Sequence, residues 1–175
     1  LGTLYHRYTF LVQTRAWKLT PDGEYHWETF ELPPLQAGEA LIRLRACGLC
    51  TGEVMDWYTL RKAPLVPGHE LVGEIVALGE GVAHLKVGDR VVVHHHAPCL
   101  KCPLCRRGAF IHCPTWRSTK LNPGGLSEYF IAPAEIVQVD VLRVPDAVSD
   151  ERAVFTEPLA CVARSLRRAG FKRGD

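Results

Sequence analysis

The sequence predicts a mainly β domain with a few short helices. Short apolar segments alternate with turns rich in glycine and proline along most of the 175 residues, a pattern typical of β-sandwiches and barrels. The clearest example is the Val- and Ile-rich stretch 65–93, which Gly68, Gly73, Gly79 and Gly81 interrupt. Small residues at such points let strands pack closely or let the backbone adopt positive φ angles. The length is sufficient for one domain with its own core.

The composition argues against several classes of protein. A formal net charge of only +2 does not favour electrostatically driven binding to nucleic acid or to a membrane surface. No apolar run approaches the ~20 residues that a membrane-spanning helix needs. Residues 1–12 lack the basic region, apolar core and cleavage site of a signal peptide. Because the cysteines are also spaced for metal rather than for disulfides, we expect a cytoplasmic protein.

One predicted strand, at 40–46, shows the period of a half-buried strand most clearly. Ile42, Leu44 and Ala46 are expected on one face, and the two arginines between them on the other. Further strands are expected at 13–19, 24–32, 90–94 and 126–131.

Two helices are expected besides these strands. A short one follows Cys50, and a longer one begins after Ser149 as its N-cap, with acidic residues in its first turn. The second helix is expected to carry Glu157 and to end in a basic segment.

Four of the seven cysteines crowd into fifteen residues with the spacing C-x2-C-x2-C-x7-C, namely Cys99, Cys102, Cys105 and Cys113. Four thiolates at this spacing can surround one ion tetrahedrally, and zinc is the usual ion. A closed shell leaves no position for a substrate, so the sequence predicts a structural zinc site. Three alternatives stay open: unligated loop cysteines, an iron–sulfur cluster, and a zinc module that binds nucleic acid.

His69 is a good metal ligand on a rigid strand, but one ligand does not make a site, so its partners must come from elsewhere in the chain. His69 and Glu70 follow the first apolar strand of the 65–93 stretch, and Cys50 lies just after the strand at 40–46. A thiolate, an imidazole and a carboxylate around zinc leave a fourth position for water or substrate. Redox pairing of Cys47 with Cys50 is the alternative for this region.

Four motifs in this order resemble those of the zinc-dependent medium-chain alcohol dehydrogenases. They are Gly48-Leu49-Cys50, Gly68-His69-Glu70 with its following glycines, the four-cysteine lobe, and the Glu157-Pro158-Leu159 of the polyol and threonine dehydrogenase branch. The resemblance covers residues 14–175 and implies a GroES-like catalytic domain, a partly open β-barrel, after an N-terminal extension at 1–13. It also implies a Rossmann domain after residue 175, and therefore that the present chain alone is inactive.

The resemblance implies hydride transfer between an alcohol or polyol and NAD or NADP. Zinc would polarise the alcohol oxygen and lower its pKa, and the hydride needs a nicotinamide as its acceptor. The expected partner is a small alcohol or polyol, and the resemblance is compatible with a homo-oligomer in a full-length protein. The alternative function is a non-catalytic zinc-bound structural or interaction module.

The same resemblance assigns Cys50 and His69 as ligands of the catalytic zinc ion. Glu70, Glu157 or both complete the shell. Glu157 is favoured in the intact enzyme, with Glu70 as its exchange partner, because adjacent strand residues such as His69 and Glu70 start on opposite faces. Glu53 stands where the family has an aspartate that hydrogen-bonds the ligating histidine, which fixes the tautomer.

Two positions depart from the family pattern. Gly52 replaces a serine or threonine that passes the alcohol proton outward, so Thr51, water or a substrate hydroxyl is expected to take that role. Three histidines at 94–96 end a strand that faces the substrate pocket in the family. His95 is expected either to touch substrate or to lie exposed on an edge strand. Trp57-Tyr58 either walls the pocket or belongs to the core.

The segment Gly79-Glu80-Gly81 half-resembles a dinucleotide-binding loop. The third glycine is absent and a strand rather than a helix follows, so the resemblance is rejected. The sequence therefore predicts no cofactor-binding residue within this chain.

Overall fold

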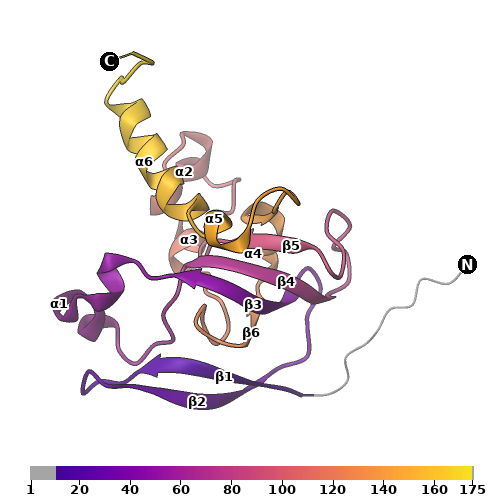
Figure 1. Cartoon of the computed structure of the whole chain (residues 1–175). Coiled ribbons are helices and arrows are strands. Elements are labelled where there is room, and N and C mark those ends of the chain that lie inside the picture. The colour runs from indigo at the N-terminus through magenta and orange to yellow at the C-terminus, as the bar shows by residue number, and fades with distance from the viewer. Residues whose placement is uncertain (1–10, 175) are drawn as a thin grey trace, which may run out of the picture.

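The structure, a computed structural model, describes residues 11–174. A five-stranded antiparallel sheet with the order β6-β3-β4-β5-β7 forms its centre, and a β1–β2 hairpin lies beside it (Figure 1). The strands are β1 (Val12–Leu19), β2 (Tyr25–Leu32), β3 (Ala40–Gly48), β4 (Glu70–Leu78), β5 (Arg90–Val93), β6 (Tyr129–Ala132) and β7 (Val141–Arg143). Most of the expected N-terminal extension lies outside the described residues, and β1 already includes Val12 and Gln13.

The helices are short, apart from α6, which extends away from the sheet (Figure 1). They are η1 (Thr51–Val54), α1 (Asp56–Thr59), η2 (Leu60–Lys62), α2 (Pro103–Arg106), η3 (Phe110–His112), α3 (Pro114–Ser118), α4 (Ala134–Val139), α5 (Asp150–Ala153) and α6 (Thr156–Arg168). Among the described residues, no helix combines the length and apolar character needed to cross a membrane.

The hairpin is joined to the rest of the domain through the backbone. The Trp17 N–H donates to the Leu126 carbonyl at 2.8 Å, and the Leu19 N–H donates to the Leu65 carbonyl at the same distance. Ala16 also forms a bridge with Ser127. These contacts close the sheet and hairpin partly around the core, as in a partly open barrel, and the predicted mainly β fold is confirmed.

The largest core cluster lies on one face of the five-stranded sheet. Ile42, Ile75, Val91 and Phe130 are fully buried there, and Ile136 of α4 covers them. A smaller cluster on the other face joins Val72, Val144 and Ala153. The sheet is therefore apolar on both faces, and the functional groups described below lie at the ends of its strands.

The prediction that Ala46 shares a face with Ile42 and Leu44 is wrong. Leu44 packs against the large cluster, whereas Ala46 packs against the Val72 cluster. The register of β3 on β4 shifts between Leu44 and Ala46. A bulge of this kind moves the following side chain to the other face. The side chains that follow the bulge towards the end of β3 therefore face the opposite way from those that alternation predicts.

The helix expected after Ser149 is two helices, α5 and α6, separated at Val154 and Phe155. Pro158 explains the break, because a proline lacks an N–H and its ring clashes with the carbonyl four residues earlier. That carbonyl belongs to Val154, and Pro158 instead lies in the first turn of α6, where a proline is tolerated. Ser149 does occupy the N-cap position of α5, but its side chain makes no capping hydrogen bond.

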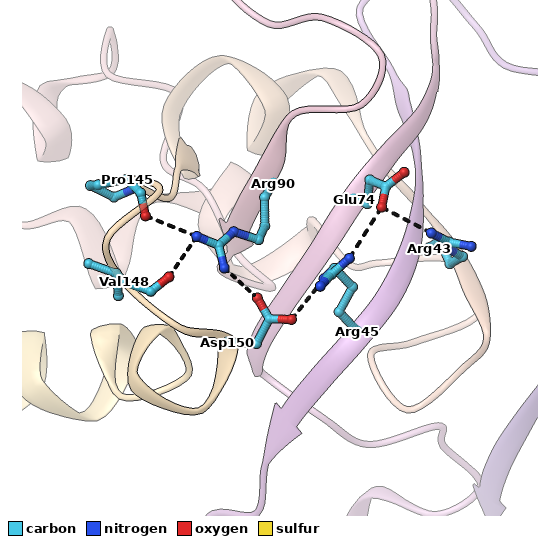
Figure 2. A network of polar contacts seen from close by, with 7 residues as sticks. All are labelled: Arg43, Arg45, Glu74, Arg90, Pro145, Val148 and Asp150. Atoms are coloured by element: carbon cyan, nitrogen blue, oxygen red, sulfur yellow. Dashed lines mark hydrogen bonds and ion pairs between the residues drawn. The ribbon is translucent and has the colours of Figure 1, made fainter.

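A network of charged side chains fixes α5 to the outer face of the sheet (Figure 2). Asp150 accepts from Arg45 Nε at 2.8 Å and from Arg90 Nη1 at 3.0 Å. Arg90 also donates to the carbonyls of Pro145 and Val148. Glu74 extends the network by binding Arg45 and Arg43. Asp150 thus links β3, β5 and the start of α5.

Asp150→Asn should lower the free energy of unfolding by about 1–3 kcal/mol, because two arginines then lose a charged partner in a partly buried place. The Asp150 side chain is only 16% exposed. Urea unfolding followed by circular dichroism measures the change. Asp146→Asn, at an exposed residue of the same loop, is the matched control and should have little effect. Equal stability of the two variants would contradict the anchoring role.

The pH dependence of this effect has a defined sign. Burial by itself would raise the pKa of Asp150, but the hydrogen bonds from Arg45 and Arg90 outweigh it and lower the pKa. Because the pKa of Asp150 is lower in the folded than in the unfolded protein, its charged form stabilises the fold at pH values above the unfolded-state pKa of about 4. This stabilisation is lost as the pH falls below that value. The difference between wild type and Asp150→Asn should therefore be full at neutral pH and shrink below about pH 4.

Candidate metal centres

The four-cysteine lobe brings its sulfurs into one group. Sγ of Cys105 lies 3.5 Å from Sγ of Cys102 and 4.0 Å from Sγ of Cys99, and Sγ of Cys113 lies 3.6 Å from Sγ of Cys99. Thiolates arranged tetrahedrally on zinc at about 2.3 Å lie roughly 3.8 Å apart. The donor set and the spacing therefore fit a four-coordinate zinc ion.

Local backbone geometry favours thiolates in this lobe. Cys102 is the N-cap of α2, and its sulfur accepts from the Cys105 N–H at 3.5 Å. The Cys113 sulfur accepts from the Cys99 N–H, and this bond helps to lower the pKa of the Cys113 thiol to about 6. Such N–H donors stabilise the charged form of a ligand.

A second group lies where β3 ends and β4 begins. The ligand atoms of Cys50, His69 and Glu70 are all within 4.8 Å of one another. Cys50 lies just after β3, at the N-cap of η1, and Glu70 is the first residue of β4. His69 precedes the regular strand and follows Gly68, whose φ of +98° turns the chain. The turn lets the neighbouring His69 and Glu70 side chains converge.

Glu53 lies behind His69 and is bound on three sides. Its carboxylate accepts from His69 Nδ1 at 3.3 Å, from the Gly68 N–H at 2.5 Å and from the Cys50 N–H at 3.2 Å. Burial alone would raise the pKa of Glu53, but these bonds lower it, and in turn Glu53 raises the pKa of His69 to about 9. With Nδ1 engaged, we infer that His69 presents Nε2 to a metal.

Gly48 makes room for the Glu70 carboxylate, a feature that sequence reasoning missed. The two residues are paired across β3 and β4. A Cβ added at Gly48 would overlap the Glu70 Oε2 atom and would lie 3.1 Å from its Cβ. A glycine inside a strand often marks such a close approach, so the signal was present in the Gly-x-Cys motif.

Glu157 is not brought into this group. It lies in the first turn of α6, and its Oε1 accepts from Sγ of Cys161 at 3.3 Å. It lines a groove of about 660 Å³ between α6, the sheet and the four-cysteine lobe. Glu53 is the main cause of the raised pKa of His69 and burial that of the raised pKa of Glu70, and the charge of Glu157 adds to both shifts.

The three histidines after β5 are held in place rather than exposed. His94 Nδ1 is 2.7 Å from the His96 carbonyl, and His96 Nδ1 is 2.7 Å from the Thr119 carbonyl. The His95 ring lies 5.1 Å from the His69 ring. Within the described part of the chain, His95 Nδ1 is buried without a hydrogen-bond partner, and burial lowers the His95 pKa to about 2. A neutral imidazole therefore lies beside the Cys50 group.

The segment after Cys50 forms another side of this group. An ideal Cβ at Gly52 would lie 3.7 Å from Sγ of Cys50 and 3.5 Å from Cε1 of Tyr58, which are ordinary contact distances. Trp57 and Tyr58 are exposed, at 67% and 42%, so the alternative of core packing for them is wrong. Thr51 is also exposed, in the first turn of η1.

Comparisons with known proteins agree with these observations. Residues 36–146 match the profile of the alcohol dehydrogenase GroES-like domain. The chain is 31% identical over 164 residues to the erythritol/L-threitol dehydrogenase of Mycolicibacterium smegmatis, with 83% of this chain and 44% of that protein covered. It is 36% identical over 155 residues to an alcohol dehydrogenase of Geobacillus stearothermophilus, with the same coverage.

A solved structure gives the same result. A short chain alcohol dehydrogenase from Escherichia coli CFT073, in complex with the cofactor NADH, superposes with a TM-score of 0.75 at 30% identity. The match covers 89% of this chain and 45% of that one, and the chain thus spans less than half the length of these relatives. On its motifs, its fold and these matches, the chain belongs to the alcohol dehydrogenase GroES-like domain family of the zinc-type medium-chain dehydrogenases.

Proposed function

We propose that this chain is the catalytic domain of a zinc-dependent dehydrogenase that transfers hydride between an alcohol or polyol and NAD or NADP. The observation that carries the proposal is the convergence of Cys50, His69 and Glu70, with Glu53 bonded to His69. Three protein donors of this chemistry fit zinc with one open position. The erythritol/L-threitol dehydrogenase and the NADH complex support the substrate class and the cofactor.

In this proposal each residue has a separate task. Cys50, His69 and Glu70 would hold the zinc ion, and Glu53 would fix the tautomer of His69 and keep its ring oriented. Zinc bound there would polarise an alcohol oxygen and lower its pKa, and a nicotinamide held by another domain would accept the hydride. Glu157 would exchange with Glu70 as a ligand when substrate enters. The exposed Thr51 hydroxyl would pass the released proton to solvent.

The four-cysteine group would hold a second zinc ion with a structural task. Its shell is complete without water or substrate, so it would take no part in the reaction. One contact between the lobe and the histidines beside the site is that of His96, whose ring lies 4.5 Å from that of Trp116 in α3. We propose a cytoplasmic location for the enzyme.

The test is steady-state oxidation of a panel of alcohols and polyols by the protein that carries this chain together with a nicotinamide-binding domain. We expect turnover with NAD or NADP, and a loss of at least about 100-fold in His69→Ala, which removes a metal ligand. His84→Ala is the matched control, because His84 lies in the turn between β4 and β5, at the opposite end of these strands. Full zinc content without turnover on any alcohol would instead favour the non-catalytic zinc module.

A further inference from the structure

One side of the Cys50 group carries a lysine that the proposed reaction does not use. Lys62, the last residue of η2, places its Nζ 3.6 Å from the centre of the Tyr58 ring. A cation over an aromatic face at this distance is attracted by the ring and is thereby held in place. The Tyr58 ring in turn lies beside Gly52, where an added Cβ would be in contact with Tyr58 Cε1, at 3.5 Å, and with Sγ of Cys50, at 3.7 Å. The lysine therefore belongs to the wall of the site.

The charge of Lys62 also acts on the histidine side of the site. Burial is the main cause of the lowered pKa values of His95 and His96, and the positive charge of Lys62 adds to both shifts. The His95 ring is the one that lies 5.1 Å from His69. The geometric anchor of Lys62 is therefore the Tyr58 ring, and its charge acts on the histidine side as well.

The charge of Lys62 is not balanced locally. Within residues 11–174, no carboxylate lies within ion-pair distance of its Nζ. Glu53 binds His69 and two backbone N–H groups, and Glu70 belongs to the metal group, so neither of these carboxylates pairs with Lys62. An ammonium group held over a ring without a counter-ion is suited to bind an anion that enters the site.

We propose, on the basis of the proposed function, that Lys62 makes this site select polyols that carry an anionic group, a carboxylate or a phosphate, distant from the reacting hydroxyl. The reacting hydroxyl would lie at the open position of the Cys50 group, and the carbon chain would pass through the space beside Gly52 and the Tyr58 ring. The anion would then meet Lys62 beside the Tyr58 ring. A neutral polyol would make the first two contacts and lack the third.

The experiment uses this chain with zinc in the four-cysteine group and cobalt(II) in the Cys50 group. The visible spectrum of cobalt(II) changes when a ligand binds at its open position. The protein is titrated with sorbitol, with D-gluconate and with sorbitol 6-phosphate. We expect the better of the two anionic compounds to bind about fivefold to tenfold more tightly than sorbitol, as a partly exposed charge contact allows. Because the contact is exposed, the preference should decline as salt is raised toward about 1 M. Comparison of the D-gluconate and sorbitol 6-phosphate titrations shows whether the site prefers a carboxylate or a phosphate.

Three variants test the assignment. Lys62→Met should abolish the preference while leaving sorbitol affinity unchanged, and Lys62→Arg should retain it. Lys86→Met removes a lysine from the β4–β5 connection, at the far end of these strands, and should leave the preference intact. An equal affinity for all three compounds, or a preference that persists in Lys62→Met, would overturn the inference.

Two further outcomes separate this inference from the proposed function. If inorganic phosphate or acetate shifts the cobalt spectrum at the same concentration as the matching polyol derivative, the anion alone accounts for binding and the inference fails. If no polyol perturbs the spectrum at all, the proposed function fails and the inference fails with it. A response to sorbitol without any preference for the anionic compounds leaves the proposed function standing and refutes the role of Lys62 alone.

Discussion

Cys113→Ser should release the metal from the four-cysteine group and unfold the surrounding lobe. Over residues 99–116, the lobe buries only Cys105 and Cys113 among its described apolar residues, whereas Leu104, Phe110 and Trp116 are partly buried and Leu100 and Ile111 are about half exposed. It therefore has little core of its own, and bound zinc in small modules supplies an apparent 10–16 kcal/mol, about the whole of their folding free energy. Limited proteolysis with cleavage mapped by mass spectrometry should show new cuts throughout the lobe, and the zinc content should fall.

The matched control is Cys161→Ser, which changes an exposed cysteine on α6 outside this lobe. It should keep both the zinc content and the protection from proteolysis. Intact protection in Cys113→Ser, or equal loss in both variants, would show that the lobe is held by its packing and not by a metal ion.

Glu70→Ala should weaken metal binding at the Cys50 group more than Glu157→Ala does. Glu70 contributes one of the three converging donors, while Glu157 bonds to Cys161 on α6. Loss of a direct ligand should exceed the roughly 10–100-fold loss of affinity typical when the partner of a ligand is removed. Competition with a coloured chelator measures both affinities in otherwise identical samples. Glu53→Gln, which perturbs only the partner of His69, should fall within that 10–100-fold range.

The opposite ranking of metal affinities in Glu70→Ala and Glu157→Ala would contradict this assignment of Glu70. A larger loss in Glu157→Ala would show that α6 moves its glutamate onto the metal, which is the arrangement that the sequence favoured for the intact enzyme. Equal and small losses in both variants would mean that neither carboxylate is a ligand.

Much of the fold could be predicted from alternation and turn residues. The strands expected at 13–19, 24–32 and 90–94 match β1, β2 and β5 to within one residue at each end. The strand expected at 126–131 begins only at Tyr129, because Leu126 and Ser127 contact β1 through separate bridges. The side change of Ala46 depends on a bulge, and alternation along one strand carries no information on the register of its partner.

The site was predictable to the extent that its residues lie in compact motifs. Local sequence already indicates the convergence of three of its residues. Cys50 and Glu53 lie just after the end of β3, and His69 follows the turn at Gly68. The place of Glu70 depends on the space at Gly48, on the neighbouring strand, and the place of Glu157 depends on the helix break before Pro158, which divides the single helix that the sequence predicts. The position of Lys62 over Tyr58 depends on side-chain packing in a short irregular helix. Hydrophobic periodicity in the sequence does not predict such a contact.

The central claim is that Cys50, His69 and Glu70 form a metal centre separate from the four-cysteine group. Atomic absorption on metal-replete chain tests it most directly. We expect about two zinc ions per chain in the wild type and about one in Cys50→Ser, because each group supplies its own complete set of protein donors. A wild-type chain that holds a single zinc ion, with the same value in Cys50→Ser, would contradict the account.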